Sequence, residues 1–131
     1  MRLLLDTCTF LWFLTRDRAL PEACRKQIMD GDCEVVLSVI SIWEAIIKQL
    51  AGRLSLPAPA GEYLVGQRER HGISSLELSE SSLPFLAKLP NHHRDPFDRI
   101  LICQAMDIGA VILTPDRAIR QYPVKTYWEH G

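Results

Sequence analysis

Four carboxylates occupy positions from which they could act as one group. Asp6 and Asp116 each follow a short apolar run, whereas Glu44 and Asp98 stand close to the expected starts of two helices. Carboxylate oxygens are hard ligands that suit Mg²⁺ or Mn²⁺, and like charges gathered in one place repel one another unless a cation intervenes. Carboxylate-held divalent ions serve phosphodiester hydrolysis because they activate water and stabilise the leaving oxygen. The four acids therefore predict a metal site for phosphodiester chemistry.

Alternating strands and helices are expected to bring these acids together. Short apolar or β-branched runs predict strands at residues 2–5, 35–39, 73–78 and 110–113, with a fifth at 124–127. The intervening segments predict helices at residues 10–14, 21–30, 41–50, 61–70, 81–88 and 95–108. Strands that alternate with helices form a parallel sheet covered on both faces, and such sheets bind ligands beyond the carboxyl ends of their strands. The acids should therefore converge on one edge of the sheet.

Each acid also has an ordinary structural explanation. The segment Ser41–Glu44 matches a helix capping box, and Asp95 matches an N-cap because proline follows it. Asp6 could be a cap, Asp116 a turn residue, and Asp98 a first-turn charge stabilised by the helix dipole. These explanations hold for single residues, and the acids taken as a set favour the metal site.

Composition limits what else the chain could be. Its 131 residues suit one domain, and a formal charge of −1 argues against a protein that holds nucleic acid through a basic surface. Setting aside the four proposed ligand carboxylates turns that charge of −1 into +3, which leaves room for a chosen nucleic acid. The sequence has no G-x-x-x-x-G-K-[ST], G-x-G-x-x-G or G-x-S-x-G motif, which argues against nucleotide-binding loops and a serine nucleophile.

Cysteine usage and hydropathy indicate the compartment. No apolar run approaches the roughly 20 residues needed to span a bilayer, and the first residues are too soon interrupted by an acid for a signal peptide. The cysteines are scattered without a C-x-x-C pair, which predicts reduced thiols in a cytoplasmic protein. They are Cys8, Cys24, Cys33 and Cys103.

Four segments together resemble a known family. Residues 3–7 (LLLDT), 41–44 (SIWE), 92–99 (HHRDPFDR) and 113–116 (LTPD) are similar to the motifs of PIN-domain nucleases. The similarity is greatest to VapC-type toxins of bacterial toxin–antitoxin pairs, and it covers nearly the whole chain in the family's order. Pro115 departs from the family, which more usually has a polar residue there.

The resemblance implies a fold, an activity and partners. The implied fold is a three-layer α/β/α sandwich, a single domain over residues 1–131, with a mostly parallel sheet of four to five strands. The implied activity is cleavage of RNA that depends on Mg²⁺ or Mn²⁺. The implied partners are a VapB-like cognate antitoxin and a second copy of the chain in a homodimer.

Carried over by position, the acids receive separate roles. Asp6 and Asp98 would be direct metal ligands, Glu44 would complete the set or act through water, and Asp116 would hold a second ion or a water on the metal. Asp95 is either a further ligand or only a helix cap. The matching positions thus supply every acid that the family's chemistry requires.

Several neighbours are candidates for supporting roles. Thr7 or Thr9 should cap the first helix, Thr7 could also orient Asp6, and Thr114 matches a hydroxyl that the family often has near its last acid. Candidate contacts to substrate phosphates or antitoxin carboxylates, with surface salt bridges as the alternative, are Arg94, Arg99 and Arg117. Trp12 and Trp43 could stack bases or pack in the core or a dimer. Loop histidines His92 and His93 and the helical Lys48 are expected to be solvated.

Three other functions compete with this hypothesis. A PIN-domain nuclease could serve RNA processing without being a toxin, and the fold could persist as a non-catalytic binding module. A phosphoacceptor domain of the response-regulator kind also gathers acids around Mg²⁺. That domain needs adjacent acids after its first strand and an acid at the end of its third, and this chain has neither.

Overall fold

The sheet predicted from the apolar runs is present and entirely parallel. A computed structural model describes residues 1–91 and 95–129. Its strands follow the order β3-β2-β1-β4-β5, and every neighbouring pair is parallel. They are β1 (Arg2–Leu5), β2 (Glu34–Ser38), β3 (Ser74–Leu76), β4 (Val111–Leu113) and β5 (Thr126–Tyr127).

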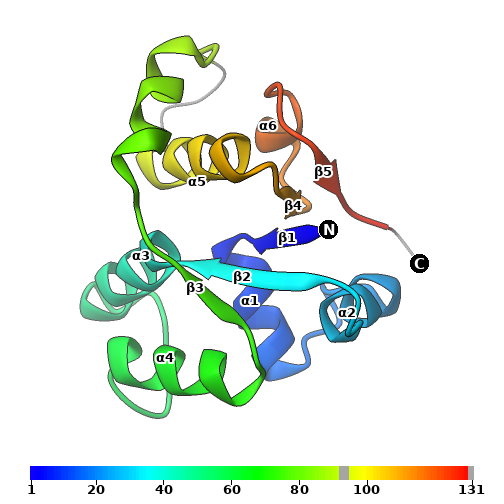
Figure 1. The fold of residues 1–131 in the computed structure, drawn as a ribbon. Coiled ribbons are helices and arrows are strands. Elements are labelled where there is room, and N and C mark those ends of the chain that lie inside the picture. The colour runs from blue at the N-terminus through cyan, green and yellow to red at the C-terminus, as the bar shows by residue number, and fades with distance from the viewer. Residues whose placement is uncertain (92–94, 130–131) are drawn as a thin grey trace.

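Helices cover the sheet on both faces, as Figure 1 shows. In that view α1, α2 and α4 lie below β1 and β2, α3 lies at the left end of β2, and α5, α6 and the 3₁₀ helix η1 lie toward the top. The core clusters place residues of α1 to α4 on one face of the sheet and those of α5 and α6 on the other. The helices are α1 (Thr7–Thr15), α2 (Glu22–Met29), α3 (Val39–Leu50), α4 (Ala60–Arg70), η1 (Glu80–Lys88), α5 (Pro96–Ile108) and α6 (Arg117–Arg120). The three-layer α/β/α architecture is thereby confirmed.

Alternation along each strand divides the core in two. Leu3 and Leu5 pack in the cluster with Phe10 of α1, whereas Leu4 packs in the cluster with Ile102 of α5. Successive side chains of a strand point to opposite faces, so a strand buried on both faces must be apolar at every position. That requirement explains why uninterrupted apolar runs, and not alternating ones, mark these strands in the sequence.

Two of the predicted helix starts are wrong. The cap of α1 is Asp6, whose Oδ1 accepts from the Thr9 amide at 2.9 Å, and neither Thr7 nor Thr9 caps it. Helix α3 begins at Val39, where Ser38 caps it by accepting from the Ile40 amide at 3.0 Å. The chain passes from β2 into α3 without a loop, so the last strand residue serves as the cap. Glu44 consequently lies beyond the first turn and completes no capping box.

Helix α5 begins as predicted, and α6 was not predicted. Asp95 caps α5 by accepting from the amides of Phe97 at 2.9 Å and Asp98 at 3.2 Å. Gly109 ends the helix in a left-handed conformation at φ 68°, which glycine adopts without steric cost. Asp116 caps the four-residue α6, a helix too short to leave a periodic pattern in the sequence.

The thiols and the hydropathy agree with expectation. All four cysteines are free, and Cys24 and Cys103 are buried. In the described ranges, no helix is both long and apolar enough to cross a membrane.

Candidate active site

The acids meet where the direction of strand addition reverses. The chain proceeds from β1 to β2 and β3 on one side, and returns to place β4 on the other side of β1. Asp6 follows β1 and Asp116 follows β4, so both stand at this switch point, where open α/β sheets bind their ligands. Helix α3, which follows β2, carries Glu44, and the first turn of α5 carries Asp98. We call Asp6, Glu44, Asp95, Asp98 and Asp116 the acid cluster.

Asp6 is the most enclosed acid of the cluster. It is 4% exposed and accepts hydrogen bonds from the Thr9 amide at 2.9 Å and the Cys8 thiol at 3.4 Å. Burial raises the pKa of its carboxyl, and hydrogen bonds from the side chains of Thr114 and Thr9 oppose that rise. The Thr114 hydroxyl in turn accepts from the Asp116 amide at 3.0 Å. Thr114 therefore links the acid after β1 to the acid after β4.

Glu44 is held at both of its carboxylate oxygens. The Thr7 hydroxyl donates to Oε1 at 2.7 Å, and the Lys48 ammonium lies 3.0 Å from Oε2. Glu44 is 8% exposed, so this carboxylate is charge-paired and hydrogen-bonded as a buried charge requires. Thr7 thus orients Glu44 and not Asp6, and Lys48 is an ion-pair partner instead of a solvated lysine.

Asp98 shows that the acids act on one another. Its pKa is raised to about 8, first because burial disfavours the charged form. The negative charges of the other acids add to the rise, and they belong to Asp95, Asp116, Glu44 and Asp6. The tertiary structure therefore places the other three predicted ligands, together with Asp95, close enough for their charges to act on Asp98.

Cys8 stands beside Asp6 but is unsuited to nucleophilic chemistry. Burial raises the pKa of its thiol, and the negative charge of Asp6 raises it further. The nucleophilic form of cysteine is the thiolate, which this environment suppresses.

Whether the cluster suits a divalent cation can be tested on its donors. All five side chains offer carboxylate oxygens, the donors that Mg²⁺ and Mn²⁺ prefer. The buried hydroxyl of Ser41, one helical turn before Glu44 on α3, has no hydrogen-bond partner among the described residues. No three described acid, cysteine or histidine side chains already converge as a metal-holding group. The donors fit a hard cation, and at Glu44 the cation would meet the positive charge of Lys48.

The predicted supporting residues do not all lie where they could contact a metal or substrate. Asp95 uses one carboxylate oxygen to accept the hydrogen bonds that cap α5. Arg99 donates to the Pro90 carbonyl at 2.9 Å and to the Tyr122 hydroxyl at 3.1 Å, so it anchors the chain before α5 and does not salt-bridge a described acid. Arg117 is exposed at the start of α6.

Of the two tryptophans predicted to stack bases or to pack, one lies at the core and the other lies beside the acid cluster. The ring of Trp12 packs against Trp128 at a centroid distance of 6.2 Å, which places it in the core. Trp43 meets Phe97 edge to face at 5.1 Å, directly beside the acid cluster. Arg94, His92 and His93 lie outside the described residues.

Sequence reasoning missed two residues that hold the acids. The Thr9 amide donates to Asp6 at 2.9 Å, and its hydroxyl donates to the Leu113 carbonyl at 3.2 Å. Nothing in the sequence places Thr9 next to β4. Lys48 could have been found, because it stands four residues after Glu44 on a predicted helix and such pairs face each other.

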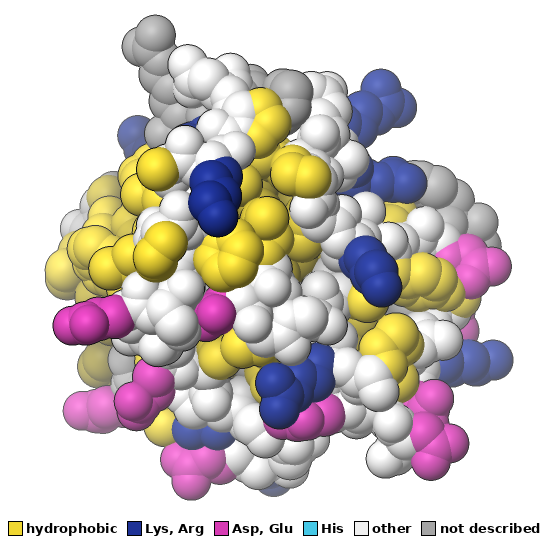
Figure 2. Space-filling view, turned by 45° about the horizontal axis from the view of Figure 1, so that its top comes forward, with side chains coloured by type: hydrophobic (Ala, Val, Ile, Leu, Met, Phe, Trp, Pro, Cys, Tyr) yellow, Lys and Arg dark blue, Asp and Glu magenta, His cyan; other side chains and the backbone are white. Residues whose placement is uncertain are grey.

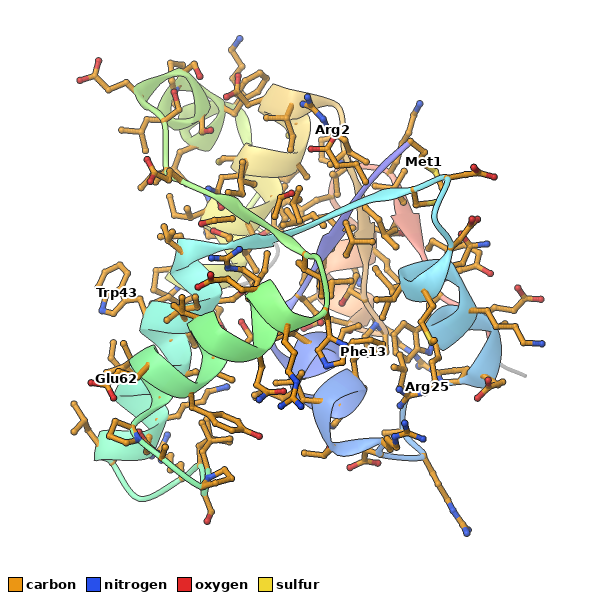
Figure 3. The ribbon with its side chains drawn as sticks, turned by 60° about the horizontal axis from the view of Figure 1, so that its bottom comes forward. Met1, Arg2, Phe13, Arg25, Trp43 and Glu62 are labelled. Carbon is orange, nitrogen blue, oxygen red and sulfur yellow. The ribbon has the colours of Figure 1, made fainter. Side chains whose placement is uncertain are left out.

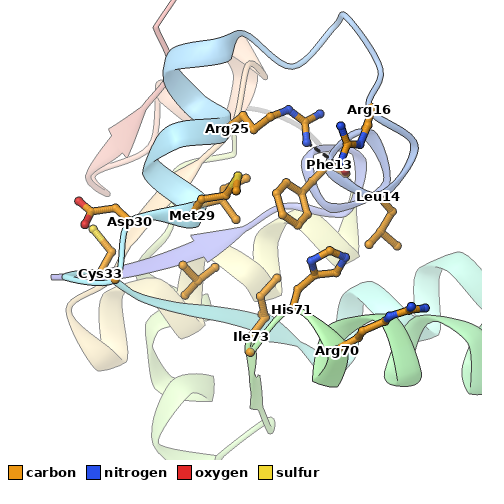
Figure 4. A pocket seen from close by; sticks show the side chains of 14 residues that line it. Phe13, Leu14, Arg16, Arg25, Met29, Asp30, Cys33, Arg70, His71 and Ile73 are labelled. Atoms are coloured by element: carbon orange, nitrogen blue, oxygen red, sulfur yellow. Dashed lines mark hydrogen bonds between the residues drawn. The ribbon is translucent and has the colours of Figure 1, made fainter.

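A cavity away from the acid cluster is a separate feature. Figure 4 shows this hollow of about 560 Å³ between the ends of α1, α2 and α4, and none of the acid cluster lines it. Arg16, Arg25 and Arg70 lie on its rim. Arg16 caps the C-terminus of α1, Arg70 ends α4, and Arg25 donates to the Phe13 carbonyl at 3.2 Å. The Arg25 guanidinium thereby places a positive charge near the C-terminal end of α1, where it complements the helix dipole.

Solved structures share this fold from end to end. The VapBC2 complex of Rickettsia felis bound to a promoter DNA fragment has a TM-score of 0.76 at 11% identity, covering 98% of this chain and 100% of that one. VapBC-1 of nontypeable Haemophilus influenzae has a TM-score of 0.66 at 20% identity, covering 97% of each chain. VapBC-5 of Mycobacterium tuberculosis, described as a member of a family of toxin–antitoxin systems, has 0.58 at 18%, covering 92% and 89%.

Sequence comparison identifies the family. A search of curated proteins gave no significant match. The family model of the PIN domain matches residues 3–125, which include the whole sheet up to β4 and all five members of the acid cluster. Since the match spans nearly the entire chain and the fold agrees, this protein belongs to the PIN-domain family of nucleases.

Proposed function

We propose that this protein is an endoribonuclease that depends on Mg²⁺ or Mn²⁺ and acts as the toxin of a toxin–antitoxin pair. The observation that carries the proposal is the effect of burial and of four neighbouring acids on Asp98, which together raise the pKa of its carboxyl to about 8. A cluster that disfavours its own ionisation is poised for a cation. Membership of a nuclease family supports phosphodiester hydrolysis as the use of that cation.

Asp6, Glu44, Asp98 and Asp116 would hold the metal. A bound divalent cation supplies positive charge where the scissile phosphate gains negative charge. The chain fixes these acids beforehand: Thr9 and Thr114 hold Asp6, and Thr7 holds Glu44. Without a cation, the Asp98 carboxyl keeps a proton at neutral pH, because its pKa is about 8.

The similarity to VapC-type toxins supports RNA as the substrate and a VapB-like antitoxin as a partner. Several structures of similar fold are VapBC complexes.

The charge distribution also favours a selective nuclease. On the face in Figure 2, basic side chains drawn in colour are scattered among acidic and hydrophobic ones instead of forming a continuous patch. A general nucleic-acid binder would need such a patch.

We also propose a homodimer formed through one stripe of α3. Trp43, Ile47 and Leu50 follow helical spacing and are 55%, 42% and 83% exposed. Trp43 projects outward from α3 in Figure 3. Large hydrophobic side chains at such spacing are typical of a helix that packs against a partner. Trp43 contacts Phe97, so this interface would lie next to the acid cluster.

Cleavage by a matched pair of variants tests the proposal. The wild-type protein should cleave single-stranded RNA, lose the activity in EDTA and regain it with Mg²⁺ or Mn²⁺. Asp98→Asn should keep the fold by circular dichroism and lose the activity, while Glu62→Gln, an exposed acid on α4, should keep both. Full cleavage by folded Asp98→Asn would overturn the assignment. Growth arrest on expression, relieved by the neighbouring antitoxin gene, separates a toxin from a nuclease of RNA processing.

A further inference from the structure

Lys48 is a cation already present beside the acid cluster. Its ammonium lies 3.0 Å from Oε2 of Glu44, one helical turn away on α3. The Glu44 side chain is 10% exposed and the Lys48 side chain 46%, so the carboxylate is buried while the lysine reaches it from solvent.

A metal at Glu44 would meet the positive charge of Lys48 at the same carboxylate. The other oxygen of Glu44, Oε1, accepts a 2.7 Å hydrogen bond from Thr7. Each oxygen keeps a second lone pair, but an ammonium 3.0 Å from Oε2 repels a divalent ion that approaches the same carboxylate. The ammonium is the partner that can leave, because its stem is flexible and half-exposed whereas Thr7 is buried at the start of α1.

Lys48 has an ordinary explanation as a surface pair on a helix. Exposed i,i+4 pairs contribute little to stability and act on nothing else. This pair differs because its carboxylate is buried and is one of the charges that act on Asp98. The ammonium therefore reduces the negative charge that attracts a cation to the cluster.

We propose that Lys48 is a resident counter-cation that competes with the divalent metal for Glu44 and thereby weakens metal binding by the cluster. It is a positioning residue, since it acts through Glu44. The inference rests on the proposed function in one respect, namely that the cluster binds a divalent ion. It goes further in assigning a lysine outside the acid set the control of metal affinity.

Mn²⁺ titration without RNA tests the inference. Free Mn²⁺ is measured by its electron paramagnetic resonance signal as each protein is added. Lys48→Met keeps the apolar stem and removes the charge, and it should bind Mn²⁺ about tenfold more tightly than wild type. That factor is what one unit charge exerts on a divalent ion at about 6 Å in a water-like dielectric. Lys48→Arg should restore the wild-type affinity.

Two controls separate competition from other effects. Lys88→Met removes the same net charge from η1, where Lys88 lies over the Phe85 ring, and should leave the affinity unchanged. In a Glu44→Gln background, Lys48→Met should lose most of its effect, because the competition needs the carboxylate.

The remaining outcomes decide against the inference. Equal affinities of Lys48→Met and Lys88→Met would mean that Lys48 is a surface pair, and weaker binding by Lys48→Met would mean that it helps Glu44 to ligate. Either result overturns the inference while the proposed function stands. A wild-type protein that binds no Mn²⁺ at millimolar concentration overturns both.

Discussion

The hydroxyl of Thr7 donates a 2.7 Å hydrogen bond to Oε1 of Glu44, across 37 positions of the sequence. It joins the first turn of α1 to the second turn of α3, the two helices that follow the neighbouring strands β1 and β2. The bond explains how a glutamate on a helix is held at the same edge as an aspartate at a strand end. It also gives Thr7 a task separate from helix capping.

Removing this hydroxyl should loosen Glu44. Thr7→Val keeps the shape of the side chain but leaves the buried Oε1 without a donor, which should lower the free energy of unfolding by about 1–3 kcal/mol. Urea unfolding measures that loss, and RNA cleavage should fall with it. Thr7→Ser should retain both properties. Thr15→Val removes an exposed hydroxyl bond on the same helix and serves as the control; an equal effect there would argue against a special role of Thr7.

Asp98 should make the protein less stable as the pH rises. Its pKa is about 8 in the folded protein against 3.8 for an ordinary aspartate, so between these values the folded state keeps a proton that the unfolded chain has lost. The free energy of unfolding should therefore fall from about pH 4 to pH 8 in metal-free buffer. Asp98→Asn should flatten this decline and be more stable at pH 8 by about 2 kcal/mol, after allowing for partial exposure. Parallel pH profiles of the two proteins would show that Asp98 ionises normally.

Divalent cations should stabilise the folded protein through the acid cluster. A ligand at 100 times its Kd adds about 2.7 kcal/mol to the free energy of unfolding. Thermal unfolding in EDTA and in Mg²⁺ should therefore give a higher Tm with Mg²⁺ for the wild type and for Glu62→Gln. Asp98→Asn should show little of this shift. A shift of equal size in all three proteins would indicate that Mg²⁺ binds elsewhere.

The α3 stripe should control the oligomeric state. Leu50→Glu places a charge on the most exposed member of the stripe and should convert a dimer into a monomer, as measured by light scattering after gel filtration. Leu83→Glu makes the same change at an exposed leucine of η1 and should leave the dimer intact. A wild-type monomer at every concentration tested would refute the proposed interface.

The local rules of the sequence were sufficient for the sheet and for α5. Residues 3–5 and 110–113 are apolar at every position, because strands buried on both faces have no solvent side to mark with polar residues. Asp95 caps α5 as its position before Pro96 predicts, since capping involves only neighbouring residues. The ordered acids were also sufficient to predict the family that sequence comparison confirms.

The tertiary structure decided which side chains hold those acids. Ser41 and Glu44 have capping-box spacing, yet β2 runs directly into α3, so Ser38 takes the cap and Glu44 turns to Thr7 and Lys48. Thr9 and Thr114 meet at Asp6 only because β1 and β4 are neighbours in the sheet, more than 100 residues apart in sequence. Hydrogen bonds and charge interactions act over a few ångströms in space regardless of sequence separation. For that reason the sequence determined which acids are present. Only the packed sheet decided which side chains hydrogen-bond to them and in which direction the pKa of a carboxyl shifts.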